Sequence, residues 1–370
     1  MVTARQGNIP SADRAAAAPV LVPGSGYIPA LDGWRSIAII SVILCHYATN
    51  LPQNVWWVKV FDNGSLGVNL FFVISGYLIC SRLIQEDKAT GSISLKKFYI
   101  RRAFRILPPF LAFLAIVAIL APVRIPRSDL LSSVFFFRNY HLSASLADVY
   151  THHIWSLSVE EHFYLLWPLT LLLLGSKRCR QMVLPLAFAI ALWRFSEWRL
   201  NLLHVPIAMR GTRTDLNLDG LLWGCFIAFV AQSSRAGALN KWFRQRLIVA
   251  AAICVPLLII IKIPLLLFWE HTVMAFLVLS TSMSPAGWTT RILEWQPLRW
   301  IGRISYSLYL WQQVFMLWPS DRQPSLLQKV PLSILSLFAC AAASYYILER
   351  PCIRLGHRLA RPVSEARSRH

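Results

Sequence analysis

An arginine and a histidine, Arg35 and His46, lie within the first long apolar stretch of the chain. Eleven positions are close to three helical turns at about 100° per residue, so both side chains lie on one helix face, about 16 Å apart along the axis. A histidine placed there can deprotonate a hydroxyl group or carry a transferred group, and an arginine can bind a phosphate. Ionisable groups in membrane helices usually face a bundle interior or a water-filled cavity, but an interfacial arginine and a packed histidine explain these two residues equally well.

A second polar segment, residues 152–164, holds three histidines and two adjacent carboxylates, Glu160 and Glu161. On a helix, Glu160 shares its face with Tyr164 four residues later, whereas Glu161 points about 100° away. We therefore expect Glu160 to be the functional carboxylate. The alternative is that both glutamates only favour a helix start through its dipole. The histidines offer no convincing ligand spacing, so we predict no metal site.

Two arginines three positions apart, Arg102 and Arg105, share a helix face in the basic segment 96–109. Two guanidinium groups so placed can bind phosphates bidentately. Charge alone favours the alternative, a basic border of a membrane span that needs no particular spacing. Further along the chain, Arg213 and Asp215 directly precede an apolar stretch and again place charge where lipid cannot solvate it.

A patch of small residues, 64–77, contains several glycines, which let membrane helices approach closely. Close helix packing is the favoured explanation for these glycines. The polar residues of the same patch, Asn69, Ser75 and Tyr77, can then face a polar cavity.

The composition predicts a membrane protein. The chain has 370 residues, of which 56% are hydrophobic and only 15% charged, with a mean hydropathy of +0.50. A soluble protein would carry about 25% charged residues. Apolar spans near the ~20 residues that a bilayer requires recur along the whole sequence. They cover roughly 36–50, 66–84, 104–121, 157–174, 182–199, 216–231, 247–262, 264–283, 301–318 and 330–348. We predict an all-α, polytopic membrane helix bundle of about ten transmembrane helices.

The net charge of +20 is distributed as expected for a membrane protein rather than a nucleic-acid-binding one. If the N-terminus is cytoplasmic, the inner segments hold 26 Lys and Arg residues and the outer segments hold 11. This asymmetry predicts that both termini are cytoplasmic. Part of the basic charge remains available for anionic lipid or for a phosphate-bearing ligand.

Outside the membrane domain, which we expect to span residues 27–355, two tails are predicted. Residues 1–26 are polar, lack the apolar core of a signal peptide and are expected to form a flexible cytoplasmic tail. Residues 356–370 are expected to form a basic cytoplasmic tail. The seven cysteines include no C-x-x-C pair and are interpreted as small core residues, with no disulfide framework.

Taken together, the motifs resemble acyltransferase family 3, a family of bacterial membrane proteins. In order along residues 27–355 they are R-x10-H from Arg35 to His46, G-x-x-G-V-x-L-F-F-V-I-S-G-Y, R-x-x-R-I-L-P, W-S-L-S-V-E-E-H-F-Y, R-T-D-x-x-x-D-G, I-S-Y-S-L-Y-L-W and Leu348-Glu349-Arg350-Pro351. Two positions depart from the family pattern. Gln312 follows Trp311 where many relatives have histidine, and His162 stands where glutamine is common. Any proton-transfer role carried over to position 312 is therefore in doubt.

The resemblance implies a ten-helix enzyme that moves an acyl group from cytoplasmic acyl-coenzyme A across the membrane to a carbohydrate hydroxyl group. Relatives acetylate cell-envelope glycans, and some branches succinylate them. We expect a stand-alone form in the bacterial inner membrane, with multiple spans and no permanently bound cofactor, because acyl-coenzyme A is a co-substrate. Acetyl is the first candidate and succinyl the second. The expected acceptor is an exopolysaccharide or another envelope glycan, lipid-linked oligosaccharides included.

The candidate catalytic residues are His46, Glu160 and Arg35. From spacing and resemblance, the candidate residues for binding donor or substrate are Arg102, Arg105, Asn69, Ser75, Tyr77, Trp155, Arg213, Asp215 and Tyr309. Glu160 can orient His46 or act as the base itself, and both direct transfer and an acyl-histidine relay fit these residues.

Two other functional classes remain open. A transporter would also place ionisable groups along a membrane pathway, but it predicts an internal inverted repeat that the sequence does not show. A scaffold subunit would not need three ionisable clusters within its spans.

Overall fold

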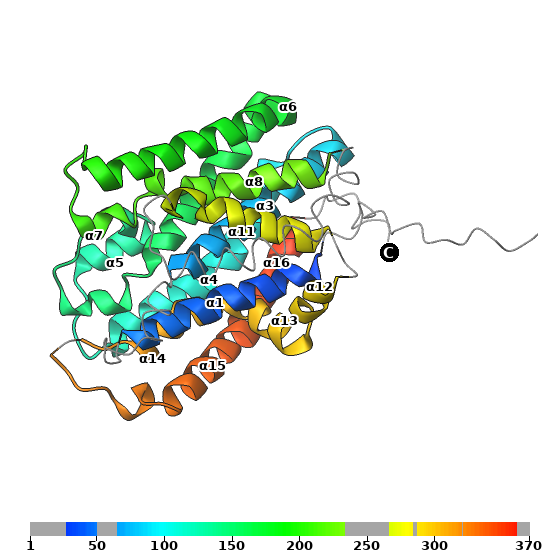
Figure 1. The fold of residues 1–370 in the computed structure, drawn as a ribbon. Coiled ribbons are helices and arrows are strands. Elements are labelled where there is room, and N and C mark those ends of the chain that lie inside the picture. Colours follow the sequence, from blue (N-terminus) through cyan, green and yellow to red (C-terminus); the bar gives the residue numbers. More distant parts are fainter. Residues whose placement is uncertain (1–26, 50–64, 234–265, 284–286, 320, 361–370) are drawn as a thin grey trace, which may run out of the picture.

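The protein is built from α-helices, as predicted (Figure 1). A computed structural model describes residues 27–49, 65–233, 266–283, 287–319 and 321–360, and every regular element in these ranges is helical. Four of the described helices are long and apolar enough to cross a membrane, namely Leu66–Thr90, Leu95–Leu120, Ile154–Leu200 and Leu332–Leu359. The number of about ten spans remains a prediction, because the expected span 247–262 lies outside the described residues.

Helices α1 (Pro29–Ala48), α3 (Ser65–Thr90), α8 (Leu218–Ala231) and α11 (Leu266–Ser282) run across the middle of the molecule, with α6 on one flank and α15 on the other (Figure 1). Small residues explain their close approach. A Cβ atom on Gly67 would collide with the backbone carbonyl of Ala38 on α1, and one on Gly76 would collide with that of Leu221 on α8. For these two glycines the packing explanation is therefore confirmed, whereas Gly64 lies outside the described residues.

Two further long helices are α4 (Leu95–Leu120) and α6 (Ile154–Leu200). Helix α4 begins where the Ser94 side chain accepts a hydrogen bond from the backbone N–H of Lys97, and it continues through Pro108 and Pro109. Helix α6 is broken at Gly175, whose φ of 76° is readily available only to glycine. The two predicted spans 157–174 and 182–199 are the two arms of this broken helix.

Short elements connect the long helices at one end of the bundle. They are α5 (Arg127–Val134), η1 (Arg138–Tyr140), η2 (Leu146–Tyr150), α7 (Ile207–Arg210) and η3 (Thr214–Leu216). Asn139 donates a hydrogen bond to the Thr214 hydroxyl over 2.8 Å, and the Thr212 hydroxyl donates to the Asn139 carbonyl over 3.0 Å. These contacts join two loops that the charge pattern assigns to the same, outer side.

The C-terminal part contains α12 (Trp288–Leu293), α13 (Gln296–Arg303), α14 (Ser305–Met316), η4 (Leu326–Gln328), α15 (Leu332–Ser344), the π-helical turn η5 (Tyr345–Glu349) and α16 (Arg350–Leu359). The predicted span 301–318 is divided at Ile304, where α13 ends and α14 begins. The expected tail boundary at residue 355 falls inside α16, whose Gly356 packs against Phe104 of α4. Residues 1–26 and 361–370 lie outside the described part.

The loops predicted to face the cytoplasm lie together at the opposite end from the outer loops. There, the Ser176 hydroxyl donates a hydrogen bond to Asp87 over 2.6 Å, and Lys88 donates to the Gln232 carbonyl over 3.3 Å. The predicted alternation of the chain between two ends is thus reproduced by these described loops. Which end faces the cytoplasm remains a prediction from the charge bias.

Candidate functional site

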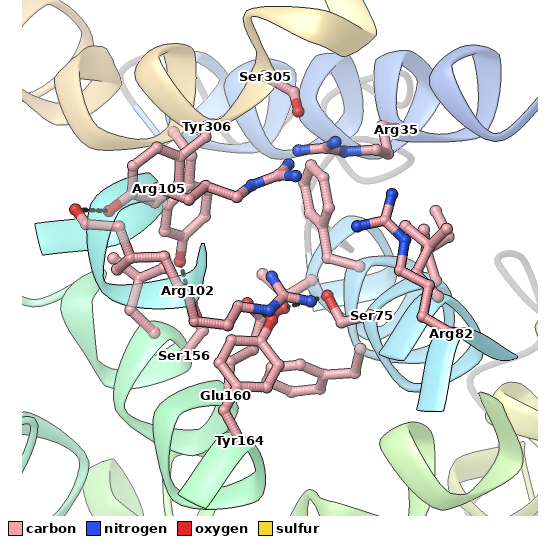
Figure 2. A pocket seen from close by; sticks show the side chains of 18 residues that line it. Arg35, Ser75, Arg82, Arg102, Arg105, Ser156, Glu160, Tyr164, Ser305 and Tyr306 are labelled. Atoms are coloured by element: carbon pink, nitrogen blue, oxygen red, sulfur yellow. Dashed lines mark hydrogen bonds between the residues drawn. The ribbon is translucent and has the colours of Figure 1, made fainter. Parts of the chain in front are cut away.

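A pocket lies between α1, α3, α4, α6 and α14, nearer the basic end of the bundle (Figure 2). Its lining comprises Arg35 from α1; Val68, Phe71, Phe72, Ile74, Ser75, Leu78 and Arg82 from α3; Arg102, Arg105 and Ile106 from α4; Ser156, Leu157, Glu160 and Tyr164 from α6; and Ser305, Tyr306 and Tyr309 from α14. The pocket holds about 840 Å³ of empty space, counting its open mouth.

Four arginines surround this space, and Figure 2 shows their guanidinium groups directed inward from different walls. Arg102 is held by aromatic rings, since its guanidinium carbon lies 4.4 Å from the ring centre of Tyr164 and 5.9 Å from that of Phe98. Within the described ranges, none of the four has a carboxylate oxygen within the 4.0 Å of an ion pair. A pocket with this excess of positive charge is suited to an anionic ligand with several negative groups.

The carboxylate in the lining belongs to Glu160. It accepts hydrogen bonds from the hydroxyl groups of Ser75, over 2.8 Å, and Tyr164, over 2.7 Å (Figure 2). The shared face of Glu160 and Tyr164 therefore turns toward the pocket, as the spacing indicated, while Glu161 is absent from the lining. The predicted functional ranking of the two glutamates is not tested by this placement.

Sequence reasoning missed Arg82, which the structure adds to the arginine cluster. Arg82 lies seven residues, or about two helical turns, after Ser75, so both side chains lie on one face of α3. Phe71 and Leu78 continue the same face. This helix-face relation was visible in the sequence and would have identified Arg82.

His46 lies in a separate hydrogen-bond network. Its Nδ1 atom is 2.6 Å from Oε1 of Gln312, and its Nε2 atom is 3.5 Å from Nε2 of Gln313. The other end of the Gln313 amide, Oε1, is 2.7 Å from Nδ1 of His153. The hydrogen bonds of Glu160 go to Ser75 and Tyr164, and these contacts of His46 go to two glutamines. The expected role of Glu160 in orienting His46 stays a prediction.

The pocket and the histidine network are linked through Tyr309. The Tyr309 hydroxyl lines the pocket, donates a hydrogen bond to the backbone carbonyl of His153 over 2.8 Å and lies 2.5 Å from the Ser156 hydroxyl oxygen. The inner end of the pocket consequently adjoins the segment that carries His153. A long ligand anchored at the arginines would extend in this direction.

Three other candidate residues, two buried and one partly buried, pack between helices and are absent from the pocket lining. Asn69 and Tyr77 on α3 are 6% and 5% exposed, and Tyr77 adjoins the site where α3 and α8 meet at Gly224. Trp155 packs its ring edge-on against Phe72, with ring centres 6.2 Å apart. These placements favour structural roles for the three side chains.

Arg213 and Asp215 pair with each other at the outer end. Arg213 donates from Nε over 2.9 Å and from a terminal nitrogen over 3.1 Å, and Asp215 also accepts from the indole of Trp193 over 3.0 Å. The hydrogen bond to Asp215 raises the pKa of the Arg213 guanidinium, so Arg213 is protonated at physiological pH. The pair contributes no residue to the arginine-lined pocket.

Comparison with known proteins gives the family. A family model described as an acyltransferase domain, that of acyltransferase family 3, matches residues 28–349. The chain belongs to this acyltransferase family. Its helices of membrane-spanning length and composition agree with the membrane-integral character of the family.

Similar curated proteins are named as O-acetyltransferases. The peptidoglycan O-acetyltransferase OatA of Listeria monocytogenes is 29% identical over 89% of this chain and 56% of its own length. A putative O-acetyltransferase of Staphylococcus aureus is 29% identical over 88% of this chain and 57% of its own length, and the O-acetyltransferase OatA of that species is 28% identical over 89% and 58%. The chain therefore spans little more than half the length of these relatives. No solved structure matches it significantly.

Proposed function

We propose that this member of the family is an O-acyltransferase of the bacterial inner membrane whose arginine-lined pocket binds acyl-coenzyme A from the cytoplasmic side. The observation that carries this proposal is the cluster of Arg35, Arg82, Arg102 and Arg105, which faces one pocket and, among the described residues, has no carboxylate oxygen within 4.0 Å. Unpaired cations gathered away from bulk water are costly, and the phosphates of coenzyme A would compensate them.

The apolar and aromatic part of the lining suits the rest of the donor. With the phosphates at the arginines, the pantetheine arm would lie along Phe71, Leu157 and Tyr306 and lead toward Tyr309. This direction carries the thioester toward the segment of His153, whose side chain shares the Gln313 amide with His46. The separation of Arg35 and His46, about 16 Å along α1, is thus spanned by the donor instead of by a direct contact.

In the proposed reaction, Nε2 of His46 removes the proton from an acceptor hydroxyl group. The hydroxyl oxygen forms an ester bond with the acyl carbon, the carbon–sulfur bond breaks, and the coenzyme A thiolate takes up the proton. A relay through an acyl-histidine would use the same nitrogen as the nucleophile and release the same products. A positioned base contributes roughly 10² to 10⁴ in rate.

For the acyl group we propose acetyl, because the relatives are named as O-acetyltransferases. Succinyl is the second candidate, since its free carboxylate would need one of the cations near the pocket. For the acceptor we propose a hydroxyl group of a cell-envelope glycan. The name of the Listeria relative favours peptidoglycan over the exopolysaccharide expected from the sequence, and the experiment compares the two.

A deletion strain complemented with wild-type protein or with His46→Ala provides the test. Mass spectrometry of purified peptidoglycan and exopolysaccharide measures which glycan loses acyl groups and whether the lost mass is acetyl or succinyl. We expect wild-type protein to restore acylation and His46→Ala to accumulate in the membrane without restoring it. Unchanged acylation of all glycans in the deletion strain, with a changed glycan yield, would instead favour a transporter.

A further inference from the structure

A network of four polar side chains connects the start of α6 with α14 and α1. It links His153, Gln313, His46 and Gln312 through contacts of 2.7, 3.5 and 2.6 Å. Three of its members, His153, Gln313 and Gln312, are almost fully buried, with exposed fractions of 2%, 2% and 0%. Water therefore has little part in deciding which nitrogen of His153 carries the proton. His46 is only partly buried, and its proton is placed by its contacts with the two amides.

Only one assignment of donors and acceptors fits all three contacts of this network. Oε1 of Gln312 can only accept, so Nδ1 of His46 must donate to it. Oε1 of Gln313 can likewise only accept, so Nδ1 of His153 donates there. The Gln313 amide nitrogen can only donate, and it faces Nε2 of His46. Both histidines thus carry a proton on Nδ1, and Nε2 of His46, which faces a donor, is the unprotonated nitrogen of that ring.

We infer that Gln312 is a positioning residue that holds His46 as the Nδ1–H tautomer and thereby makes Nε2 its basic nitrogen. This inference rests on the proposed function, in which His46 acts on the acceptor hydroxyl group. The two contact lengths support it. The contact at Nδ1 is short, whereas the 3.5 Å contact at Nε2 is at the weak limit of a hydrogen bond, so Nε2 can exchange it for a substrate proton.

Proton uptake at Nε2 is compatible with the same neighbours. The Nδ1–H of the resulting imidazolium still donates to Gln312, while the long contact from Gln313 is lost because two donors would face each other. Gln312 cannot itself take up the proton, since an amide does not titrate. A histidine at position 312 could both accept a hydrogen bond and titrate, whereas the glutamine can only orient its partner.

The direct test is nitrogen-15 NMR of the imidazole groups in detergent-solubilised protein. The chain has nine histidines, and the His46 signals are identified by their loss in His46→Ala. We expect a protonated Nδ1 and an unprotonated Nε2 in wild-type protein. Gln312→Leu removes the acceptor at nearly the same volume and should shift the proton toward Nε2, whereas Gln312→Glu keeps an acceptor oxygen and should preserve the tautomer. A protonated Nε2 in wild-type protein would overturn the inference.

The kinetic test separates positioning from folding. Gln312→Leu should lower kcat by at least about tenfold, up to the roughly 10² to 10⁴ that a positioned base contributes, and leave the donor KM unchanged. Gln312→Glu should recover most of the loss. The control is Gln328→Leu, since Gln328 donates to the backbone carbonyls of Val314 and Leu317 near the end of α14 and accepts from Ser325, and none of these hydrogen bonds involves a side chain of the network. It should leave both kcat and the His46 signals unchanged.

The two hypotheses fail in distinguishable ways. If His46→Ala retains normal acyl transfer, the proposed role of the histidine is wrong, whatever tautomer NMR shows. If His46→Ala is inactive but Gln312→Leu keeps both the wild-type tautomer and the wild-type kcat, only the positioning role of Gln312 is wrong.

Discussion

The double variant Arg102→Lys, Arg105→Lys tests the donor pocket most sharply. Lysine keeps both positive charges, and with them the charge bias that orients the membrane spans, but it loses the planar fork that binds phosphate bidentately. It also removes the guanidinium group that stacks 4.4 Å from the ring centre of Tyr164. The double variant therefore keeps the charge of the pocket and changes the phosphate-binding geometry and this one stacking contact.

The expected magnitude follows from the contacts that would be lost. A charge-assisted hydrogen bond contributes about 1.5–3 kcal/mol, and a lysine retains roughly half of what a bidentate arginine provides. Each substitution then costs about 1 kcal/mol of donor-binding free energy. If the two costs are taken as approximately additive, the double variant loses about 2 kcal/mol. At about 1.4 kcal/mol per factor of ten, the donor KM should rise roughly 30-fold.

The assay measures transfer from labelled acetyl-coenzyme A in membranes that contain equal amounts of each variant. Arg101→Lys is the matched control, because Arg101 precedes Arg102 on α4 but pairs with Glu86 at 3.5 Å and is absent from the pocket lining. We expect a raised KM in the double variant alone, with kcat little changed. Wild-type kinetics in the double variant would show that these arginines serve only the charge bias, and an equal effect of Arg101→Lys would point to general electrostatics.

Three further experiments test the site and the fold. His46→Ala should abolish acylation of the product glycan, as measured by NMR of that glycan, while protein accumulation stays normal. Glu160→Gln should lose most activity and Glu161→Gln should keep most of it, because only the first carboxylate lines the pocket; equal mild losses would support simple helix capping, which contributes about 0.3–1 kcal/mol. Gly76→Ala should lower the free energy of unfolding by about 1–3 kcal/mol in detergent, since its Cβ would meet the backbone of α8, whereas Gly211→Ala, with open space around it, should not.

Helix-face arguments predicted the parts of the site that a single helix positions. Glu160 with Tyr164 on α6, and Arg102 with Arg105 on α4, do share faces that line the pocket. The same arithmetic, applied to α3, would have improved the prediction. At about 100° per residue, Tyr77 points about 200° away from Ser75 and Asn69 about 240° away, so neither could share the pocket face. Arg82 does share this face. Because it lies at the basic end of an apolar helix, it looked like one of the basic residues that only orient a membrane span.

The parts of the site that require two helices to be placed against each other could not be predicted in this way. Glu160 lies beside Ser75 because the glycines of α3 fix the position of α3 along α1 and α8, and that position sets which turn of α3 faces which turn of α6. A one-turn shift, about 5.4 Å, would have brought a different residue of α6 to the same level. The sequence contains the glycines but not the register that their contacts produce.

This register explains why the two clusters of ionisable groups stay apart. A carboxylate placed directly against the imidazole would have formed a charged pair deep in the bundle, which is costly to desolvate. Instead, the carboxylate lines the arginine pocket, where the hydroxyl groups of Ser75 and Tyr164 donate to it, and the imidazole contacts neutral amides. The site thus has a charged end that can bind an anionic donor and a neutral end where His46 contacts the side chains of Gln312 and Gln313. Because Tyr309 belongs to the pocket lining and also holds the backbone of His153, a donor that fills the pocket touches both ends at once.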